Sequence, residues 1–310
     1  MFLGLRVLGV ERFQFNPSEN ESNKHIPKDI LRRVKALKNI QLENVKHEIE
    51  YYRRIHQLDL EFKKIYDENH EKRKRIYLGT YEPTDSECWW LDPNEDGSME
   101  TMEMENMNIE DKGETANKGI PDFWLTVFKN ANETVLNRTV ELVDEPILKH
   151  LQDVTVTLPE ANTGFSLHFH FAQNEFFNNS VLTKEYELRN EIDRRDPLDY
   201  DGPEMLSARG CDIDWKDDMN PGIKITMKKQ KLKGKGGTKT ILKEEKRDTF
   251  FNFFQPPAIS MDTERAPGDD ELVSELDTDF DIGLGIKDKL IPKAVLYYTG
   301  EARDPDSDED

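Results

Sequence analysis

The chain has 310 residues with 63 acidic and 43 basic side chains, and its formal net charge at pH 7 is −20. A charge of this size favours basic partners and argues against a nucleic-acid-binding surface, which needs an excess of Lys and Arg. No apolar run reaches the length of a membrane span, and Cys88 and Cys211 form neither a CxxC pair nor a zinc-type cluster.

The N-terminal part of the sequence predicts a leader followed by one long helix. Residues 1–25 have turn and coil chemistry and are predicted to be a disordered leader. In the segment 26–78 no Gly or Pro follows Pro27, and apolar residues recur at spacings of three and four. A second apolar stripe lies on a shifted face of this helix: Leu42, Val45, Ile49 and Tyr52.

The length of this helix predicts dimerisation. About 50 helical residues span roughly 75 Å, which is more than one core of this chain covers. We therefore expect the helix to pair with a second copy of the chain, and a lone helix that bridges solvent is the alternative. The residues expected in the dimer contact form the main apolar stripe: Ile30, Val34, Leu37, Ile55, Leu58, Phe62 and Ile65.

Residues 79–119 are predicted to form an accessory acidic insert. Gly79 ends the helix, and Trp89 and Trp90 stand before a Met-containing stretch that is rich in Asp and Glu. We expect the acidic stretch to be a loop. Large aromatic side chains are usually buried, so we expect the two tryptophans to dock on something.

Residues 120–300 are predicted to form one α+β domain. Apolar residues of the segments 123–128 and 142–151 have helical spacing, and the order of helices before antiparallel strands is typical of this fold class. Alternation of apolar and polar residues predicts strands at 154–158, 165–171 and 181–192. Strands at 223–229 and 238–245 flank a Gly-rich turn and predict a hairpin. Four phenylalanines are expected to fill the core: Phe250, Phe251, Phe253 and Phe254.

Charges are segregated into blocks along this domain. The net charge is −6 for residues 191–218, +8 for the hairpin segment 223–247, −8 for residues 262–281 and −5 for the acidic tail 301–310. An ordinary solvated surface intersperses both signs, whereas blocks of one sign produce directional fields. The blocks favour a charged macromolecular partner, and the alternative is a solubilising surface without a partner.

Motifs for catalysis, metals and phosphates are weak or absent in the sequence. His168 and His170 share one face of a strand, but no third ligand lies nearby, so we interpret them as polar-face residues and not as a metal site. The Gly-rich stretch 234–240 departs from the phosphate-loop pattern and lies inside the hairpin. We expect no enzymatic activity, no metal and no cofactor.

Eight segments resemble the nucleosome assembly protein family, in particular its nucleosome-assembly-protein-1-like branch, and they occur in the family's order. They are RVKALK at 33–38, GIPDFWLTV at 119–127, EPILKHL at 145–151, FHF at 169–171, NEFF at 174–177, DGPE at 201–204, TFFNFF at 249–254 and KDKLIP at 287–292. The resemblance covers roughly residues 26–300. The insert 79–119 resembles the accessory segment of that branch.

The resemblance implies a histone chaperone with a long dimerisation helix and an antiparallel β-sheet domain backed by helices. Such a protein is a homodimer, binds core histones on an acidic face, shields them from non-specific contacts with DNA and promotes nucleosome assembly without ATP. The acids that we expect to contact histones are Glu191, Asp193, Asp199, Asp201, Asp212, Asp214, Asp217, Asp218, Asp269, Asp270 and Glu271. The alternative function is an acidic adaptor for other basic cargo, or a regulator of enzymes like the template-activating-factor branch.

The basic hairpin resembles the family's nuclear import signal. Five lysines would contact an import receptor: Lys228, Lys229, Lys231, Lys233 and Lys235. A weak nucleic-acid-binding patch is the alternative interpretation of this basic cluster. The segment 26–37 contains leucine and isoleucine residues that fit an export signal and are equally explained by packing. We therefore expect the protein to shuttle between nucleus and cytoplasm, with neither a membrane nor a specific nucleic-acid sequence among its partners.

Overall fold

The computed structural model describes residues 27–90, 119–131, 140–160, 163–193, 196–231, 238–259 and 269–302. The predicted leader 1–25 lies outside the described residues. So do most of the acidic insert, the tip of the hairpin with Lys233 and Lys235, and the acidic tail from residue 303.

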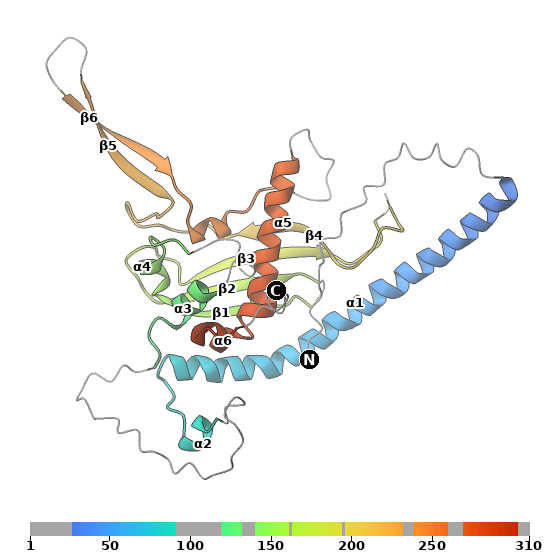
Figure 1. The fold of residues 1–310 in the computed structure, drawn as a ribbon, viewed down its shortest axis with the longest axis horizontal. Helices are drawn as coiled ribbons and strands as arrows, with labels where there is room; N and C mark the ends of the chain where they lie inside the picture. The colour runs from blue at the N-terminus through green and yellow to red at the C-terminus, as the bar shows by residue number, and fades with distance from the viewer. Residues whose placement is uncertain are drawn as a thin grey trace, which may run out of the picture.

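One long helix, α1 (Lys28–Tyr77), dominates the N-terminal part of the protein, and its first half projects away from the body (Figure 1). Its 50 residues contain no Gly or Pro, Pro27 precedes its first turn, and Gly79 follows with a φ of 67° that ends it. Ion pairs at spacings of three and four, such as Arg54 to Glu50 at 3.0 Å, support the helix along its exposed length. No helix among the described residues has the length and apolar character needed to cross a membrane.

The two apolar stripes of α1 differ in burial. On the shifted stripe, Val45 and Ile49 are buried and Tyr52 is half-buried. On the main stripe, five of the seven predicted residues are exposed by 43–65%, with Leu37 the most exposed, and the other two are half-buried. The main stripe is therefore an apolar surface that the single chain leaves uncovered.

Four antiparallel strands form the central sheet in the order β1-β2-β3-β4. They are β1 (Leu151–Thr157), β2 (Phe165–Phe171), β3 (Val181–Arg189) and β4 (Glu204–Gly210). The alternation of β2 is complete, because Phe165, Leu167 and Phe169 are buried while His168 and His170 are half-buried on the opposite face. This single-sided burial confirms the predicted α+β class.

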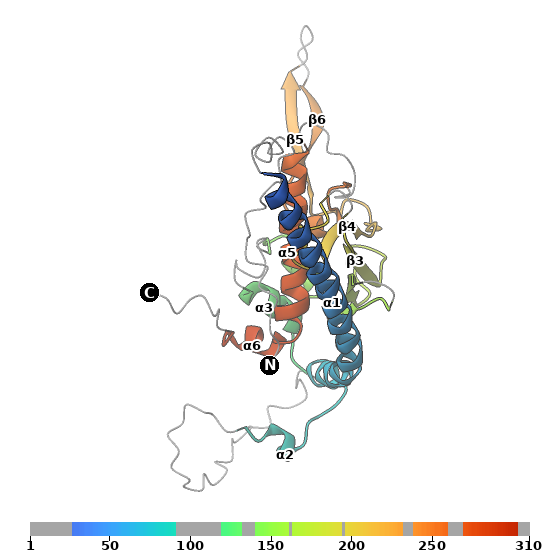
Figure 2. The same ribbon diagram turned by 90° about the vertical axis from the view of Figure 1, so that its right-hand side faces the viewer.

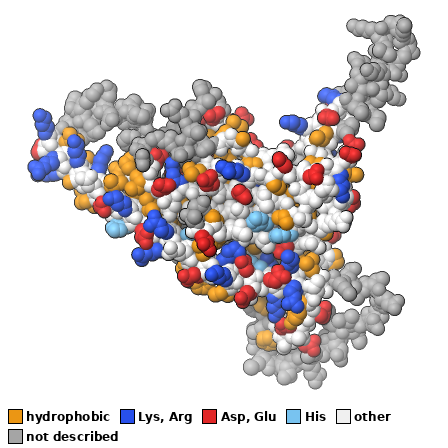
Figure 3. Space-filling model, turned by 180° about the vertical axis from the view of Figure 1, so that it is seen from behind, with side chains coloured by type: hydrophobic (Ala, Val, Ile, Leu, Met, Phe, Trp, Pro, Cys, Tyr) orange, Lys and Arg blue, Asp and Glu red, His pale blue; other side chains and the backbone are white. Residues whose placement is uncertain are grey.

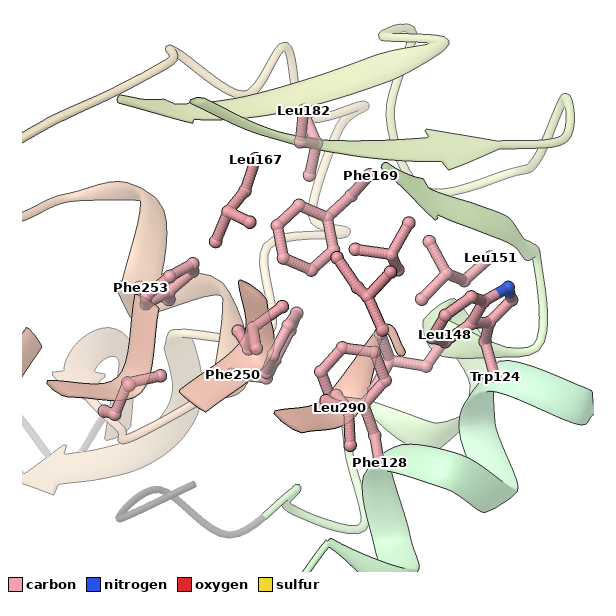
Figure 4. Packing of buried hydrophobic residues seen from close by; sticks show 14 of the residues in the cluster. Trp124, Phe128, Leu148, Leu151, Leu167, Phe169, Leu182, Phe250, Phe253 and Leu290 are labelled. Atoms are coloured by element: carbon pink, nitrogen blue, oxygen red, sulfur yellow. The ribbon is translucent and has the colours of Figure 1, made fainter. Parts of the chain in front are cut away.

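Short helices cover the apolar face of the sheet (Figure 1). They are α3 (Phe123–Asn130), α4 (Glu145–Leu148), the 3-10 helix η2 (Phe250–Phe254), α5 (Asp270–Gly285), the π-helical turn η3 (Ile286–Leu290) and α6 (Ala294–Thr299). Phe169 lies at the centre of the core, where the rings of Phe250, Phe253 and Phe254 approach it to 6.0, 6.1 and 5.2 Å between centroids (Figure 4). The predicted cluster of phenylalanines thus joins η2 to the sheet.

The C-terminal end of α1 is bonded firmly to this domain. The Tyr77 hydroxyl donates to the buried carboxylate of Asp153 at 2.9 Å and accepts from Trp124 Nε1 at 3.0 Å, and the Tyr77 ring stacks on Phe123. The Arg73 guanidinium donates to the carbonyl of Ile291 at 2.7 Å. These contacts make α1 and the sheet domain one body.

A two-stranded hairpin, β5 (Ile223–Lys231) and β6 (Thr238–Lys246), rises from one end of the body (Figure 2). Its base is held by Arg247, whose guanidinium donates to the carbonyl of Pro221 at 2.9 Å. The adjacent Thr249 and the amide of Phe250 bind the buried carboxylate of Asp144, the amide at 2.8 Å. The predicted hairpin is confirmed, and its root is anchored in the core.

Three expectations from the sequence are wrong or incomplete. The segment 142–151, predicted to be helical, forms only the one-turn helix α4. The Asp144 carboxylate before it accepts hydrogen bonds from the amides of Glu141 and Phe250, and strand β1 begins at Leu151. Leu142 is 81% exposed. Trp89 and Trp90, which follow the short helix α2 (Asp85–Cys88), are 75% and 81% exposed and do not dock on the described chain. Strand β4 and helix α5 were not predicted.

Candidate interaction surfaces

The structure distributes the predicted acidic residues over three separate surfaces. One group lies in the loop 190–203 between β3 and β4, the second in the segment 211–218 after β4, and the third at the start of α5. Because the first two groups flank β4, they lie at opposite ends of a strand of seven residues, a separation of about 23 Å. A partner that contacts both must extend along the edge of the sheet.

The first group, which we call the acidic loop, comprises the described residues 190–193 and 196–203 and lies against α1. Glu191, Asp199 and Asp201 have exposed side chains. Asp193 is half-buried and forms an ion pair with Arg189 at 3.3 Å, and the same guanidinium donates to Glu204 at 2.7 Å. Asp193 therefore helps to fix the loop, and it shares the one positive charge of Arg189 with Glu204.

The second group, the segment 211–218, is tied to the loop between β2 and β3. The Asp214 carboxylate accepts from Asn178 Nδ2 at 2.9 Å, and its amide donates to Asn179 Oδ1 at 2.7 Å. Asp212 and Asp217 are exposed, as is Asp218, whose φ of 60° lies in a left-handed conformation that Asp tolerates. Asp214 thus has a local structural role, whereas the carboxylates of the other three acids are exposed to solvent.

The third group opens helix α5. Asp269 is the residue before the helix, and Asp270 and Glu271 lie in its first turn, where negative charge is favourable against the helix N-terminus. The sequence reasoning missed further acids on this helix: Glu275, Asp277 and Asp281. The signal was present, because residues 269–286 contain seven acids and no Lys or Arg.

The carboxyl of Asp281 shows that these charges influence each other. Burial raises its pKa, and the neighbouring carboxylate of Asp277 raises it further. A basic partner that approaches this face of α5 would relieve the repulsion.

Helix α5 is fixed on the sheet by a buried ion pair. Lys184 projects from the apolar face of β3 with no exposed side-chain surface, and its ammonium lies 2.8 Å from Asp279 Oδ1. The same ammonium donates to the carbonyl of Phe253 at 2.7 Å, and the Tyr186 hydroxyl donates to Asp279 Oδ2 at 3.0 Å. The acidic face of α5 is therefore preorganised relative to the sheet.

The polar face of the sheet carries a pair of histidines on β2, beside the exposed Glu185 and Glu187 of β3. The rings of His168 and His170 lie 6.5 Å apart, and each is hydrogen-bonded at 2.9 Å to a threonine of β1. Burial lowers the pKa of both imidazoles, so they are uncharged at neutral pH. The described residues contain no group of three or more His, Cys, Asp or Glu side chains arranged to hold a metal ion.

Two further predicted surfaces lie outside the sheet. Figure 3 shows exposed apolar side chains along α1. The exposed large apolar residues of this helix are five members of the main stripe together with Ile40 and Tyr51. Of the five predicted import lysines, Lys228, Lys229 and Lys231 belong to β5 of the projecting hairpin. The other two lie outside the described residues.

The comparisons with known proteins agree with each other. The family model described as "Nucleosome assembly protein (NAP)" matches residues 32–301. Nucleosome assembly protein 1-like 1-A of Xenopus laevis is 43% identical over 288 residues, which are 92% of this chain and 72% of that protein. Nucleosome assembly protein 1-like 1 of Homo sapiens is 42% identical over 289 residues, which are 92% of this chain and 73% of that protein.

Solved structures show the same fold. The structure of Nucleosome Assembly Protein 1 from Plasmodium knowlesi aligns with a TM-score of 0.54 at 25% identity and covers 89% of this chain and 99% of that one. A malaria parasite Nucleosome Assembly Protein aligns with a TM-score of 0.51 at 24% identity and covers 90% of this chain and 100% of that one. The similarity thus includes both the long helix and the sheet domain.

Proposed function

The chain belongs to the nucleosome assembly protein family, and we propose that it is a histone chaperone that binds core histones through its acidic surfaces and promotes nucleosome assembly without ATP. The observation that carries this proposal is the family match over residues 32–301, which spans every acidic group described above. The segregation of charge on a rigid body supports it.

The mechanism follows from the electrostatics of histone–DNA contacts. Basic proteins bind DNA largely by releasing counterions from phosphates, so they also bind non-specific DNA tightly. An acidic protein surface occupies the same basic side chains with contacts that are individually weak, each worth about 0–1 kcal/mol. Histones held in this way are protected from wrong contacts and pass to the complete nucleosome, because that assembly offers more contacts. Such a transfer runs downhill and needs no ATP.

Dimerisation is part of the proposal. The main stripe of α1 exposes apolar side chains over the whole helix, including Leu37 at 65% and Ile65 at 55%. Pairing with a second α1 in antiparallel orientation would remove this surface from water. Because α1 is bonded to the sheet domain at Tyr77 and Arg73, the pairing would hold two sets of acidic surfaces in a fixed relation.

We also propose that the hairpin β5–β6 carries a nuclear import signal, so that the protein shuttles between cytoplasm and nucleus. The support is its net charge of +8 over residues 223–247, in a chain whose net charge is −20. The hairpin projects from the body, which leaves it accessible to a receptor (Figure 1).

A reconstitution experiment tests the proposed function. The purified protein is mixed with core histones and relaxed plasmid without ATP, and nucleosome formation is read from plasmid supercoiling after topoisomerase treatment. We expect supercoils to accumulate with the chaperone and not without it. Tight binding of other basic proteins, such as ribosomal proteins, together with no nucleosome formation would instead support the acidic adaptor.

A further inference from the structure

The described residues of the acidic loop, 190–193 and 196–203, are clamped onto the middle of α1 by specific contacts near both ends of the loop. At its start, Asn190 Nδ2 donates to the carbonyl of Ile49 at 3.3 Å. Near its end, the Tyr200 ring meets the Tyr52 ring edge to face, with centroids 6.2 Å apart. The Tyr200 hydroxyl donates to Asn190 Oδ1, so the two ends of the loop are also joined to each other.

A glycine permits the close approach at this joint. Gly202 has a φ of 140°, in the region that side-chain-bearing residues avoid, and a β-carbon there would lie 3.3 Å from the Tyr52 ring. The Tyr52 hydroxyl also lies 3.4 Å from the carbonyl oxygen of Asp201 and donates to it. Three neighbouring residues of the loop, 200–202, therefore contact one tyrosine of α1.

Each anchor of the loop is the sequence neighbour of an exposed acid. Glu191 follows Asn190, while Asp199 and Asp201 flank Tyr200. Burial raises the pKa of the Tyr200 hydroxyl, and Tyr52 and the carboxylates of Glu48, Glu204 and Asp201 raise it further. The hydroxyl therefore keeps its proton and remains a donor at neutral pH, with acids from α1, the loop and β4 gathered around it.

We propose that Tyr52, Tyr200 and Gly202 are positioning residues for histone binding: they hold the exposed carboxylates of the acidic loop against α1 as part of a rigid surface. This inference rests on the proposed function. A loop that is already ordered loses less conformational entropy when a partner binds than a mobile one does. Because α1 is also the proposed dimer helix, the same clamp sets the loop's charges at a fixed place beside the dimer contact.

A double-mutant cycle on the full chain tests the proposal. One arm is Tyr200→Ala, and the other removes the loop's exposed charges with three substitutions: Glu191→Gln, Asp199→Asn and Asp201→Asn. The readout is the Kd for fluorescently labelled, purified core histones. Each arm alone should weaken binding about 5- to 10-fold, since exposed ion pairs are worth up to ~1 kcal/mol each. The combined variant should bind no more weakly than either arm, because mobile carboxylates contribute little.

A matched control uses the acids at the opposite end of β4. Asp217→Asn and Asp218→Asn should weaken binding by the same factor in the wild-type and in the Tyr200→Ala backgrounds, because the clamp does not hold them. Tyr200→Phe, which keeps the ring contact with Tyr52, should restore most of the affinity. Gly202→Ala should reproduce Tyr200→Ala, because the backbone at φ 140° is strained for a residue with a β-carbon and the added atom crowds the Tyr52 ring. It gives an independent arm if Tyr200→Ala fails to fold.

The outcomes separate this inference from the proposed function. Equal losses from the loop acids in both backgrounds, or wild-type affinity in folded Tyr200→Ala and Gly202→Ala variants, would overturn the clamp while leaving the chaperone intact. A wild-type protein that binds no histones would overturn the proposed function and the clamp's role with it.

Discussion

The buried pair of Lys184 and Asp279 offers the sharpest test of how α5 is held on the sheet. The Lys184 side chain has no exposed surface and that of Asp279 is 4% exposed, with 2.8 Å between the ammonium and Oδ1. Replacing Asp279 by Ala leaves a buried ammonium without its carboxylate partner, although contacts such as those to the Phe253 carbonyl at 2.7 Å and to the rings of Phe253 at 4.7 Å and Tyr186 at 5.4 Å remain. Removing one partner of a buried pair typically costs about 3–5 kcal/mol.

The double replacement Lys184→Met with Asp279→Leu should behave differently. It removes both charges together and leaves apolar groups of similar volume, a change that is often neutral or stabilising in proteins. The Tyr186 hydroxyl keeps its 2.8 Å hydrogen bond to the backbone carbonyl of residue 279, so it is not left unsatisfied. We expect the double variant to regain most of the stability that Asp279→Ala loses.

Urea denaturation at fixed protein concentration, followed by circular dichroism, measures both effects. A loss of about 3–5 kcal/mol is a large part of the 5–15 kcal/mol that typically stabilises a folded protein, so the midpoint should shift clearly. Glu271→Ala, at an exposed position of the same helix, is the matched control and should shift it little. A loss below about 1 kcal/mol for Asp279→Ala, or a double variant as unstable as the sum of the single ones, would refute this reasoning.

Three further predictions concern the other surfaces. Light scattering should give twice the chain mass of 36.2 kDa, and Leu58→Asp with Phe62→Asp should produce monomer or unfolded chain, because charges enter the helix contact; a monomeric wild type at micromolar concentration would contradict this. Replacing Lys228, Lys229 and Lys231 of β5 by Ala should move a fluorescent fusion to the cytoplasm without changing histone affinity. An unchanged distribution would rule out the hairpin as the import signal. Burial lowers the pKa of His168 and His170, so the unfolded chain takes up protons first as pH falls through about 6.5, and stability should fall there. His168→Asn with His170→Asn should flatten that decline in thermal melts, and an unchanged slope would show that these imidazoles do not cause it.

The sequence predicted the elements whose periodicity is uninterrupted. Helix α1 has 50 residues without Gly or Pro, and β2 alternates buried and half-buried residues over its whole length. Helix α5 was hidden because its acids suggested only a charged segment, and one of them, Asp279, occupies a core position that is stable only beside Lys184. Strand β4 has only two buried apolar residues, Met205 and Ala208, so its identity depends on pairing with β3.

The candidate site was predicted in composition but not in arrangement. The acidic residues are visible as blocks of charge, whereas their division between the two ends of β4 depends on the sheet topology. The clamp joins Tyr52 to Asp201, which are 149 positions apart in the sequence, so no local sequence pattern predicts it. The ion pair that engages Asp193 and the hydrogen bonds that engage Asp214 likewise follow only from the fold.

Binding to purified core histones across a salt series tests the central claim most directly. The Debye length falls from about 10 Å at 0.1 M salt to about 3 Å at 1 M, so contacts between exposed charges weaken steeply over this range. The proposed chaperone should bind histones tightly at 0.1 M salt, with an affinity that falls as salt rises. Replacing the exposed acids Asp212, Asp217 and Asp218 by Lys should weaken binding most at low salt. Absence of binding at 0.1 M salt, or an affinity that salt and these substitutions leave unchanged, would contradict the account.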